Sequence, residues 1–449
     1  MSDAGSDGPT ESYSGEPTAE RLIEIATYFI YIGIVGFGGP LVHIAMMEDD
    51  LSGEDGWTDQ QTFMEGLAIC NTLPGPASTQ LGIFMGWVRG GTLGALVAGG
   101  AFMLPTFIIV VVFSWLYFAY QAVPSVEAFF YGINPVVIGL IAGAAWSMGN
   151  SALAEGRTDL EFHIGSETWS VDYLLGALLS ATIVVTVVAN PNPVLSFIAA
   201  GLVTVFLYRS TWIRHNIRQV GVWGLVGVVA TLLFLRRDRI LAVLRPRVRT
   251  AVESSPIWGL LTVLWTNEGV KLFLFMLYTG SFIYGGGLVL IPFIEKYVVN
   301  EFAWMTGREF VDGVAIGQLS PGPVVMTTAF IGYKLLLDIS DGSVGVAVLG
   351  ALVATIGAFG PSFVFILGFF PSFAQVREND VIQTALMGVN AAVVGAILGA
   401  IVTLARDSFV DLLTVSVAGL TFALFLRGVD AVYLIFGGGA VGIAAFYLL

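Results

Sequence analysis

Long stretches without a single charged residue follow one another along almost the whole chain. They cover residues 25–47, 66–88, 90–126, 128–154, 173–208, 219–235, 272–294, 313–333, 344–376, 381–405, 412–426 and 431–449. Apolar residues fill these stretches continuously instead of alternating with polar ones, which is typical of helices and excludes a β-barrel. Because a helix needs roughly 20 apolar residues to cross a bilayer, the pattern predicts an all-α polytopic membrane protein with about twelve or thirteen transmembrane helices.

The composition agrees with this class. Hydrophobic residues make up 56% of the 449 residues and charged residues only 12%, whereas a soluble protein has about a quarter of its residues charged. We therefore expect a multi-pass protein of the plasma membrane, in contact with the lipid bilayer and without a nucleic acid partner. Residues 1–24 are polar and acidic and lack the basic start of a cleavable signal peptide, and residues 1–21 are expected to form a disordered tail.

The charged residues indicate the habitat of the host, and the few cysteines and histidines exclude disulfides within the chain and argue against a metal enzyme. The net charge is −14, and three lysines stand against sixteen arginines. An excess of acidic residues with few lysines is typical of a halophilic host, because hydrated carboxylates keep exposed surfaces soluble in concentrated salt. One cysteine, Cys70, excludes an intrachain disulfide, and three scattered histidines (His43, His163 and His215) argue against a metal enzyme. We expect no cofactor.

An internal repeat divides the chain into two related halves. Shifting the sequence by 247 positions lays Gly38-Gly39 on Gly285-Gly286 and the triplet 74–76 on the triplet 321–323, both Pro-Gly-Pro. Further matches in this register are Glu48/Glu295, Trp57/Trp304, Phe63/Phe310 and Gly66/Gly313. Beyond an insertion around residues 338–343 the match resumes at a shift of 256, with the pairs Pro105/Pro361, Gly132/Gly388, Asn134/Asn390 and Gly139/Gly395.

The repeat defines the domain organisation. We expect a first transporter repeat over residues 22–210, a linker over 211–269 and a second repeat over 270–449. The linker holds the short apolar run 219–235 and an arginine-rich segment. If that run crosses the membrane, the second repeat is inverted relative to the first; if it lies on the surface, the repeats are parallel. The distribution of basic residues between the loops does not decide between the two.

Glycine and proline interrupt two helices in each half. The first helix of each half runs into glycines, at 36–39 and 285–287, and the second begins at a Pro-Gly-Pro triplet. Two prolines within three residues remove two backbone donors and disfavour helical geometry in the preceding residues. Proline suits the first turn of a new helix, so each triplet is expected to open a half-helix at membrane depth. The alternative is that these residues are only packing kinks.

A half-helix start has a chemical consequence. Its unpaired N–H groups and partial positive charge bind anions without a cationic side chain, and repeated transporters place substrate between such broken helices. Amides and hydroxyls near the breaks supply further donors. The candidate substrate-binding residues are Gly38, Gly39, His43, Asn71, Thr72, Pro74, Gly75, Ser78, Thr79, Gln80, Gly286, Gly287, Gln318, Ser320, Pro321, Gly322, Thr327 and Thr328.

These motifs resemble the chromate ion transporter family. The resemblance rests on residues 36–47 and 71–76 in the first half and on 285–287 and 317–324 in the second, and it covers nearly the whole chain. It implies a duplicated secondary transporter, usually described with antiparallel halves, that exports chromate and thereby confers chromate resistance. It also implies sulfate as a competing anion. Both anions are tetrahedral dianions of nearly equal size, which suits a site of neutral donors.

Several titratable and amide residues allow more than one interpretation. Glu48, Glu65, Glu295 and Asp312 recur in pairs near helix ends and are either proton-coupling groups or interfacial structural residues. His43 either donates to the anion, titrates during coupling or is structural. Asn134 and Asn390 occupy equivalent uncharged stretches, which favours a paired role between the repeats over simple helix packing.

Other functions stay open or are excluded. The donors do not distinguish chromate from sulfate or another oxyanion, nor efflux from uptake, and a passive anion channel and a homodimer remain open. An enzyme is not expected, because the chain has no His-Glu-x-x-His and no Gly-x-Ser-x-Gly motif. A primary pump within this chain is excluded by the lack of a phosphate-binding loop.

Overall fold

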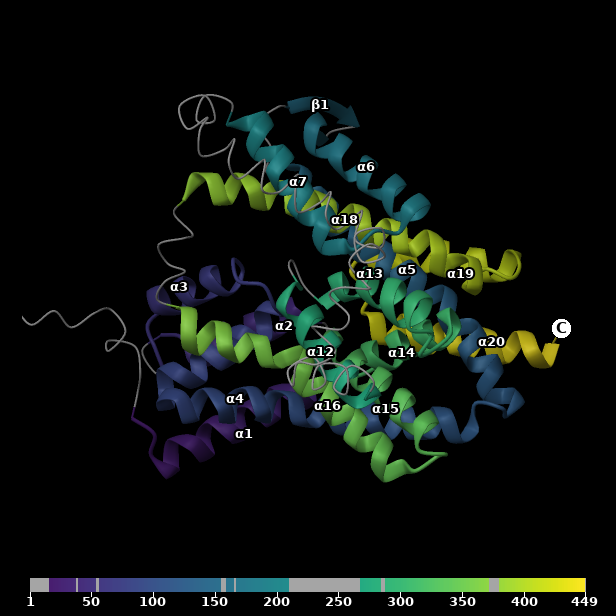
Figure 1. Ribbon diagram of the computed structural model, residues 1–449, viewed down its shortest axis with the longest axis horizontal. Helices are drawn as coiled ribbons and strands as arrows, with labels where there is room; N and C mark the ends of the chain where they lie inside the picture. Colours follow the sequence, from purple (N-terminus) through teal and green to yellow (C-terminus); the bar gives the residue numbers. More distant parts are fainter. Residues whose placement is uncertain are drawn as a thin grey trace, which may run out of the picture.

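The computed structural model describes residues 16–37, 39–53, 56–154, 159–164, 167–209, 267–283, 287–370 and 379–448. Most of the predicted tail and linker, including the run 219–235, therefore lie outside the described residues. The described chain is almost entirely helical (Figure 1). Five of its helices are long and apolar enough to cross a membrane. The prediction of an all-α polytopic membrane protein is confirmed.

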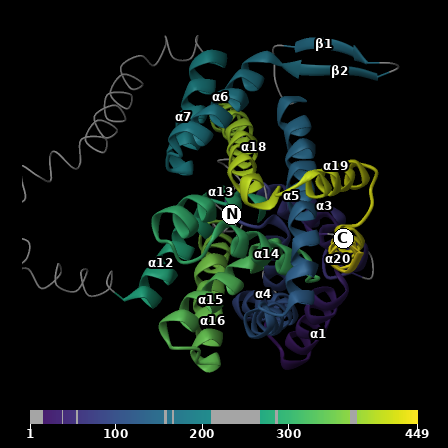
Figure 2. The same ribbon diagram turned by 90° about the vertical axis from the view of Figure 1, so that its right-hand side faces the viewer.

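The first half contains seven helices and one hairpin of strands among its described residues. They are α1 (Ala19–Val35), α2 (Pro40–Leu51), α3 (Gln60–Cys70), α4 (Ala77–Tyr120), α5 (Pro124–Ala154), β1 (Asp159–Ile164), β2 (Glu167–Asp172), α6 (Tyr173–Ala189) and α7 (Pro193–Tyr208). The antiparallel strands β1 and β2 project beyond the helices at one end of the molecule (Figure 2). No charge-free stretch predicted them, since they lie within the charged segment between residues 154 and 173.

The second half repeats this order with more irregular turns. Its elements are α12 (Glu268–Ser281), the 3-10 turn η1 (Gly287–Val289), α13 (Leu290–Ile294), the π-helical η2 (Glu295–Glu301), α14 (Gly307–Gln318), the 3-10 turn η3 (Val324–Met326), α15 (Thr327–Ile339), α16 (Val344–Val364), the π-helical η4 (Phe365–Phe369), α18 (Asp380–Ser408), α19 (Leu412–Leu426) and α20 (Ala431–Leu448).

Large apolar side chains cover much of the outer surface. Val188 of α6, Leu202 of α7 and Leu412 of α19 are 80%, 64% and 81% exposed. Apolar exposure on this scale is unfavourable in water and favourable against lipid tails. These faces therefore lie against the bilayer.

The 44-residue helix α4 is a hairpin of two helical arms. Gly90 and Gly91 leave helical geometry, and Gly91 has a φ of 60°, which favours glycine. The two arms fold back on each other so closely that a side chain on Gly86 would overlap Gly94. The second half builds the same hairpin from α15 and α16, with Gly332 against Gly350. The insertion found in the sequence therefore lengthens the turn of this hairpin.

The halves exchange their last helix pairs. Helix α5 of the first half packs against α19 and α20 of the second, and α18 packs against α6 and α7 of the first. Figures 1 and 2 show α6, α7 and α18 side by side. The paired glycines of the repeat explain the close approach: Gly132 meets Gly438, and its equivalent Gly388 meets Thr204. Each half is therefore completed by helices of the other.

Equivalent helices of the two halves run antiparallel. The ring of Phe84, on the first arm of α4, stacks on Phe370 beyond the end of α16, with centroids 4.5 Å apart. Reciprocally, the ring of Phe118 near the end of α4 stacks on Phe330 of α15, at 5.1 Å. The second arm of α4 thus ends where the α15–α16 hairpin turns, and α16 ends beside the turn of the α4 hairpin. The halves are inverted relative to each other.

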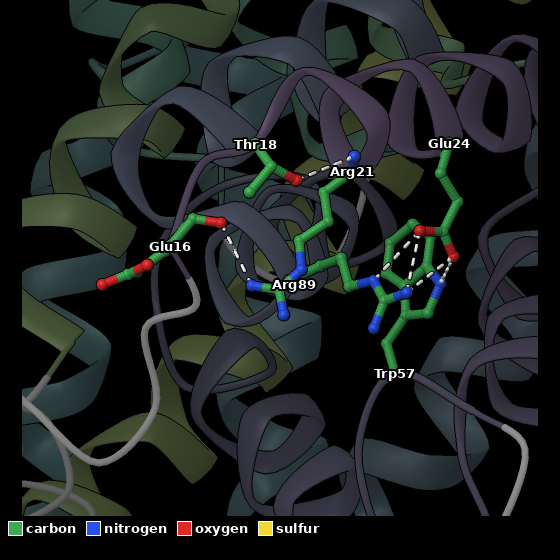
Figure 3. A network of polar contacts seen from close by, with 6 residues as sticks. All are labelled: Glu16, Thr18, Arg21, Glu24, Trp57 and Arg89. Carbon is green, nitrogen blue, oxygen red and sulfur yellow. Dashed lines mark hydrogen bonds and ion pairs between the residues drawn. The ribbon is translucent and has the colours of Figure 1, made fainter.

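Matching polar clusters mark the start of each half. In the first, the carboxylate of Glu24 accepts hydrogen bonds from Arg89 and from the indole of Trp57 (Figure 3). In the second, Glu268 accepts a hydrogen bond from Trp304 and pairs with Lys271. Tryptophan with a paired cation is typical of membrane interfaces. The two clusters therefore anchor opposite ends of the inverted pair.

Candidate functional site

The first glycine break holds a buried histidine. Helix α1 ends at Val35, and α2 begins at Pro40 after Gly39, whose φ is 80°. The Nε2 atom of His43 lies 2.7 Å from the carbonyl oxygen of Gly36, so Nε2 carries a proton and donates it to this oxygen. The imidazole thus closes the end of α1, and its Nδ1 atom has no hydrogen-bond partner among the described residues.

The first Pro-Gly-Pro turn crosses into the second half. The backbone N–H of Gly75 donates to the carbonyl oxygen of Ile283, at 2.5 Å, just after α12. The side-chain Nε2 of Gln80 donates to the carbonyl of Pro74, at 2.6 Å, and fixes the turn from inside. Gly75 has a φ of 135°, and a methyl group there would overlap Gln80. The first triplet therefore lies against the glycine break of the other half.

The second Pro-Gly-Pro turn makes the reciprocal approach. The backbone of Pro321 lies next to the side chain of His43. The glycine break of the second half also lies beside the turn that follows its own triplet, because a side chain on Gly287 would touch Val324 and Val325 of η3. All four breaks thus converge on one region at the centre of the inverted pair.

The start of α4 presents unused donors. Ser78 and Thr79 are fully buried, and neither hydroxyl has a hydrogen-bond partner among the described residues. They lie in the first turn of α4, where backbone N–H groups have no partner within the helix. Buried hydroxyls are normally satisfied, so two orphans in one turn indicate a place for a ligand with acceptor oxygens.

The corresponding turn of the second half is chemically different. The hydroxyls of Thr327 and Thr328 donate to the carbonyls of Val324 and Val325, both at 2.9 Å. Ser320 donates in the same way to the carbonyl of Gly317. Each of these hydroxyl protons is engaged by the backbone, and the 3-10 turn η3 that precedes α15 is apolar.

Two further hydroxyls lie at the centre that were not predicted from the sequence. Thr106 of α4 and Ser362 of α16 are fully buried, and within the part of the chain that the structure describes their hydroxyls have no hydrogen-bond partner. A methyl group on Gly75 would lie 2.9 Å from the Oγ atom of Ser362, and one on Gly322 would overlap the hydroxyl of Thr106. The sequence does contain a signal for these two hydroxyls, because each directly follows one of the paired prolines, Pro105 and Pro361.

The remaining candidates are less buried than these hydroxyls or lie outside the described residues. Asn71 ends α3 with an exposed side chain, and the hydroxyl of Thr72 donates to the carbonyl of Ala68. Gln318 is half-buried at the end of α14. Gly38 and Gly286 lie outside the described residues.

Comparison with known proteins identifies the family. The sequence model described as chromate transporter matches residues 23–206 and again residues 270–443. The chain belongs to the chromate transporter family. It is therefore an integral membrane transporter of the duplicated form. The resemblance inferred from the Gly-Gly-Pro and Pro-Gly-Pro motifs is confirmed.

Curated relatives span nearly the whole chain. A chromate transport protein of Cupriavidus metallidurans is 30% identical over 432 residues, 95% of this chain and 94% of the relative. A probable chromate transport protein of Synechococcus elongatus is 31% identical over 396 residues, 88% of each. A chromate transport protein of Pseudomonas aeruginosa is 28% identical over 458 residues, 98% of each. No solved structure matches this member of the family.

The four repeat carboxylates of this transporter differ between its halves. Asp312 and Glu295 of the second half are 2% and 4% exposed, whereas Glu48 and Glu65 of the first half are half-exposed. The carboxylate of Glu295 accepts hydrogen bonds from Asn190 and Asn300. Glu48 accepts one from Gln60, and Glu65 accepts one from Gln61. A buried carboxylate is costly unless it is hydrogen-bonded, so the two acids of the second half depend more on their partners than the two of the first half.

Asp312 lies between the halves. Its Oδ2 atom accepts a hydrogen bond from the hydroxyl of Tyr117 of α4, at 2.6 Å. Asn134 of α5 also interacts with the carboxyl group. The Oδ1 atoms of both Asp312 and Asn134 have no hydrogen-bond partner among the described residues. The carboxyl group therefore has hydrogen-bond donors from both helices of the first half that pack against it, and one of its oxygens stays unpaired among the described residues.

The paired asparagines do not contact each other. Asn134 lies beside Asp312, whereas Asn390 lines a small cavity of about 210 Å³ with Ser147 and Ser151 of α5. Each asparagine thus faces the other half, with a different partner. No group of three or more His, Cys, Asp or Glu within the described residues is placed to hold a metal ion.

Proposed function

We propose that this protein is a secondary transporter that exports chromate across the plasma membrane and thereby confers chromate resistance. The observation that carries the proposal is the convergence of the four helix breaks, with the buried unpaired hydroxyls of Ser78 and Thr79 beside the turn that binds Ile283. The names of the curated relatives support chromate as the substrate.

The chemistry of the centre suits a tetrahedral dianion. Hydroxyls and the N–H groups at the start of α4 stabilise negative charge through hydrogen bonds and the helix dipole. Segments 36–47, 71–88 and 313–333 contain no Lys or Arg. A site of neutral donors binds the anion without the strong attraction of a paired cation, which permits release. Sulfate has the same charge and shape, so we expect it to compete.

The membrane potential favours export. A dianion that leaves a cell with a negative interior gains about 4.6 kcal/mol per 100 mV of potential. Inverted halves offer a way to expose one central site to either side in turn, by a movement of one half relative to the other. The rocking of the exchanged helix pairs α6–α7 and α19–α20 would carry such a movement.

The test is uptake of labelled chromate and labelled sulfate into inverted membrane vesicles and proteoliposomes, with and without an imposed potential and pH gradient. We expect chromate accumulation that depends on the potential and is competed by sulfate. Preloading with unlabelled chromate should accelerate entry of labelled chromate, because a carrier exchanges its substrate and a channel does not. Failure to move either anion would overturn the proposal.

A further inference from the structure

We propose that the hydroxyls of Thr106 and Ser362 complete the anion site as hydrogen-bond donors. Each hydroxyl belongs to one half and lies at the Pro-Gly-Pro turn of the other half. This inference rests on the proposed transport of a tetrahedral oxyanion and names the groups that hold it from both halves. Neither residue belongs to a motif that the sequence marked.

The first support is the placement of the two hydroxyls. Thr106, on the α4 helix of the first half, lies against Gly322 of the second-half triplet. Ser362, on the α16 helix of the second half, lies against Gly75 of the first-half triplet. Because glycine has no side chain, each hydroxyl reaches the backbone of the turn itself. The contacts are reciprocal across the inverted pair.

The second support is that both hydroxyls are left unsatisfied. Buried serines and threonines elsewhere on the same helices donate to the carbonyl four residues earlier: Ser114 to Val110 at 2.7 Å and Thr355 to Ala351 at 2.8 Å. Thr106 and Ser362 are equally buried, yet make no hydrogen bond. Four buried hydroxyls of the described residues have no partner, and all four lie at the proline breaks: Ser78, Thr79, Thr106 and Ser362.

The third support is the symmetry of the ligand. Thr106 and Ser362 occupy equivalent repeat positions, at the shift of 256 that pairs their preceding prolines. Equivalent positions in inverted halves are related by the pseudo-twofold axis between them. A tetrahedral anion has twofold axes of its own, so its oxygens can accept from one hydroxyl of each half. The anion would then link both halves, which suits a substrate that controls their relative movement.

The test compares Thr106→Val and Ser362→Ala with matched controls. Val keeps the shape of Thr, and Ala removes only the hydroxyl of Ser. Thr355→Val and Ser114→Ala remove buried hydroxyls from the same two helices that already have a backbone partner. Initial rates of chromate and sulfate uptake into proteoliposomes give KM and kcat for each variant, after equal amounts of inserted protein are verified.

We expect Thr106→Val and Ser362→Ala each to raise KM for both anions roughly tenfold or more, since each removes a hydrogen bond to a charged ligand. The two controls should keep the KM of the unmodified protein. Thr106→Ser, which retains the hydroxyl, should restore KM, whereas a purely structural role of the methyl group would not be rescued.

The outcomes separate the two proposals. If the unmodified protein transports chromate or sulfate and both hydroxyl-free variants keep its KM, the inference about Thr106 and Ser362 is wrong while the proposed function stands. If equal losses occur in the control variants, the hydroxyls act through packing and the inference is likewise overturned. If the unmodified protein moves neither anion, the proposed function itself fails.

Discussion

The two Pro-Gly-Pro turns are alike in backbone and unlike in chemistry. Both open a helix and both lie at the centre of the inverted pair. The first is followed by Ser78 and Thr79, whose hydroxyls have no partner, and the second by Thr327 and Thr328, whose hydroxyls are bound to their own helix. The acidic residues differ in the opposite sense: Asp312 of the second half is buried, whereas its equivalent in the first half, Glu65, is half-exposed.

This difference indicates which features of a duplicated transporter stay alike in both halves and which diverge. Glycine and proline set the geometry of the breaks and are retained in both halves. Side chains that do not shape the backbone are free to diverge, so the turn of the first half can present free hydroxyls while the second half holds the buried Asp312. Five experiments test this division, in order of decreasing expected effect.

The largest effect is expected from Gly75→Ala. The φ of 135° is strained for alanine, and the added methyl group would overlap the amide of Gln80. We expect loss of nearly all chromate uptake with normal membrane insertion. Gly342→Ala is the matched control, since Gly342 also has a positive φ, of 87°, but faces open space. Equal uptake by both variants would show that the crossing of the first turn into the second half is unimportant.

A large effect on coupling is expected from Asp312→Asn. Asparagine keeps the size of the side chain but cannot bind and release a proton, so the imposed pH gradient should no longer change the rate of uptake. Exchange of labelled for unlabelled chromate, which needs no net proton movement, should persist. Glu65→Gln, at the equivalent half-exposed position, should keep the response to pH. A full response to the pH gradient in Asp312→Asn would exclude Asp312 as the coupling group.

The donors of the two turns can be compared directly. The double variant Ser78→Ala with Thr79→Val removes two unpaired hydroxyls, and we expect KM for chromate to rise about tenfold. Thr327→Val with Thr328→Val removes two hydroxyls that bind their own carbonyls, so KM should change less than about threefold. The KM values for chromate uptake into proteoliposomes measure both effects. A larger rise in KM for the Thr327 and Thr328 variant would show that the second turn, and not the first, supplies the donors.

The exchange of helix pairs should be visible in stability. A methyl group at Gly132 would overlap the backbone at Gly438, and one at Gly388 would overlap Thr204. Overpacking of this kind costs about 1 to 3 kcal/mol, so Gly132→Ala and Gly388→Ala should each lower the Tm in detergent. Gly100→Ala, whose methyl group would meet open space, provides the control. Unchanged Tm values in both variants would argue against tight packing between the halves.

The smallest effect is expected at the ends of the molecule. Glu24→Gln weakens the contact with Arg89, which is 2.8 Å long and partly exposed. Exposed ion pairs contribute about 0.2 to 1 kcal/mol, so the Tm should fall only slightly and uptake should stay normal. Glu268→Gln, which weakens the corresponding cluster of the second half, should behave alike. A strong loss of uptake in only one of the two would reveal a further difference between the halves.

Much of the fold follows from sequence alone. Charge-free stretches determine a helical membrane protein because a helix satisfies its own backbone hydrogen bonds in lipid, and the continuous apolar pattern differs from the alternation of barrel strands. The repeat is visible because glycines and prolines that shape the backbone tolerate little change, and the positions of the breaks follow from the missing N–H groups of Pro74, Pro76, Pro321 and Pro323.

Only the tertiary structure decided how the halves are oriented and which side chains are available. The inversion depends on contacts such as Phe84 with Phe370, which no local pattern encodes. Ser78 and Thr327 look equally suited as donors in the sequence, yet the local helix satisfies only the hydroxyl of Thr327. Asp312 and Glu65 likewise differ through burial, because the environment of a side chain is set by helices far away in the chain.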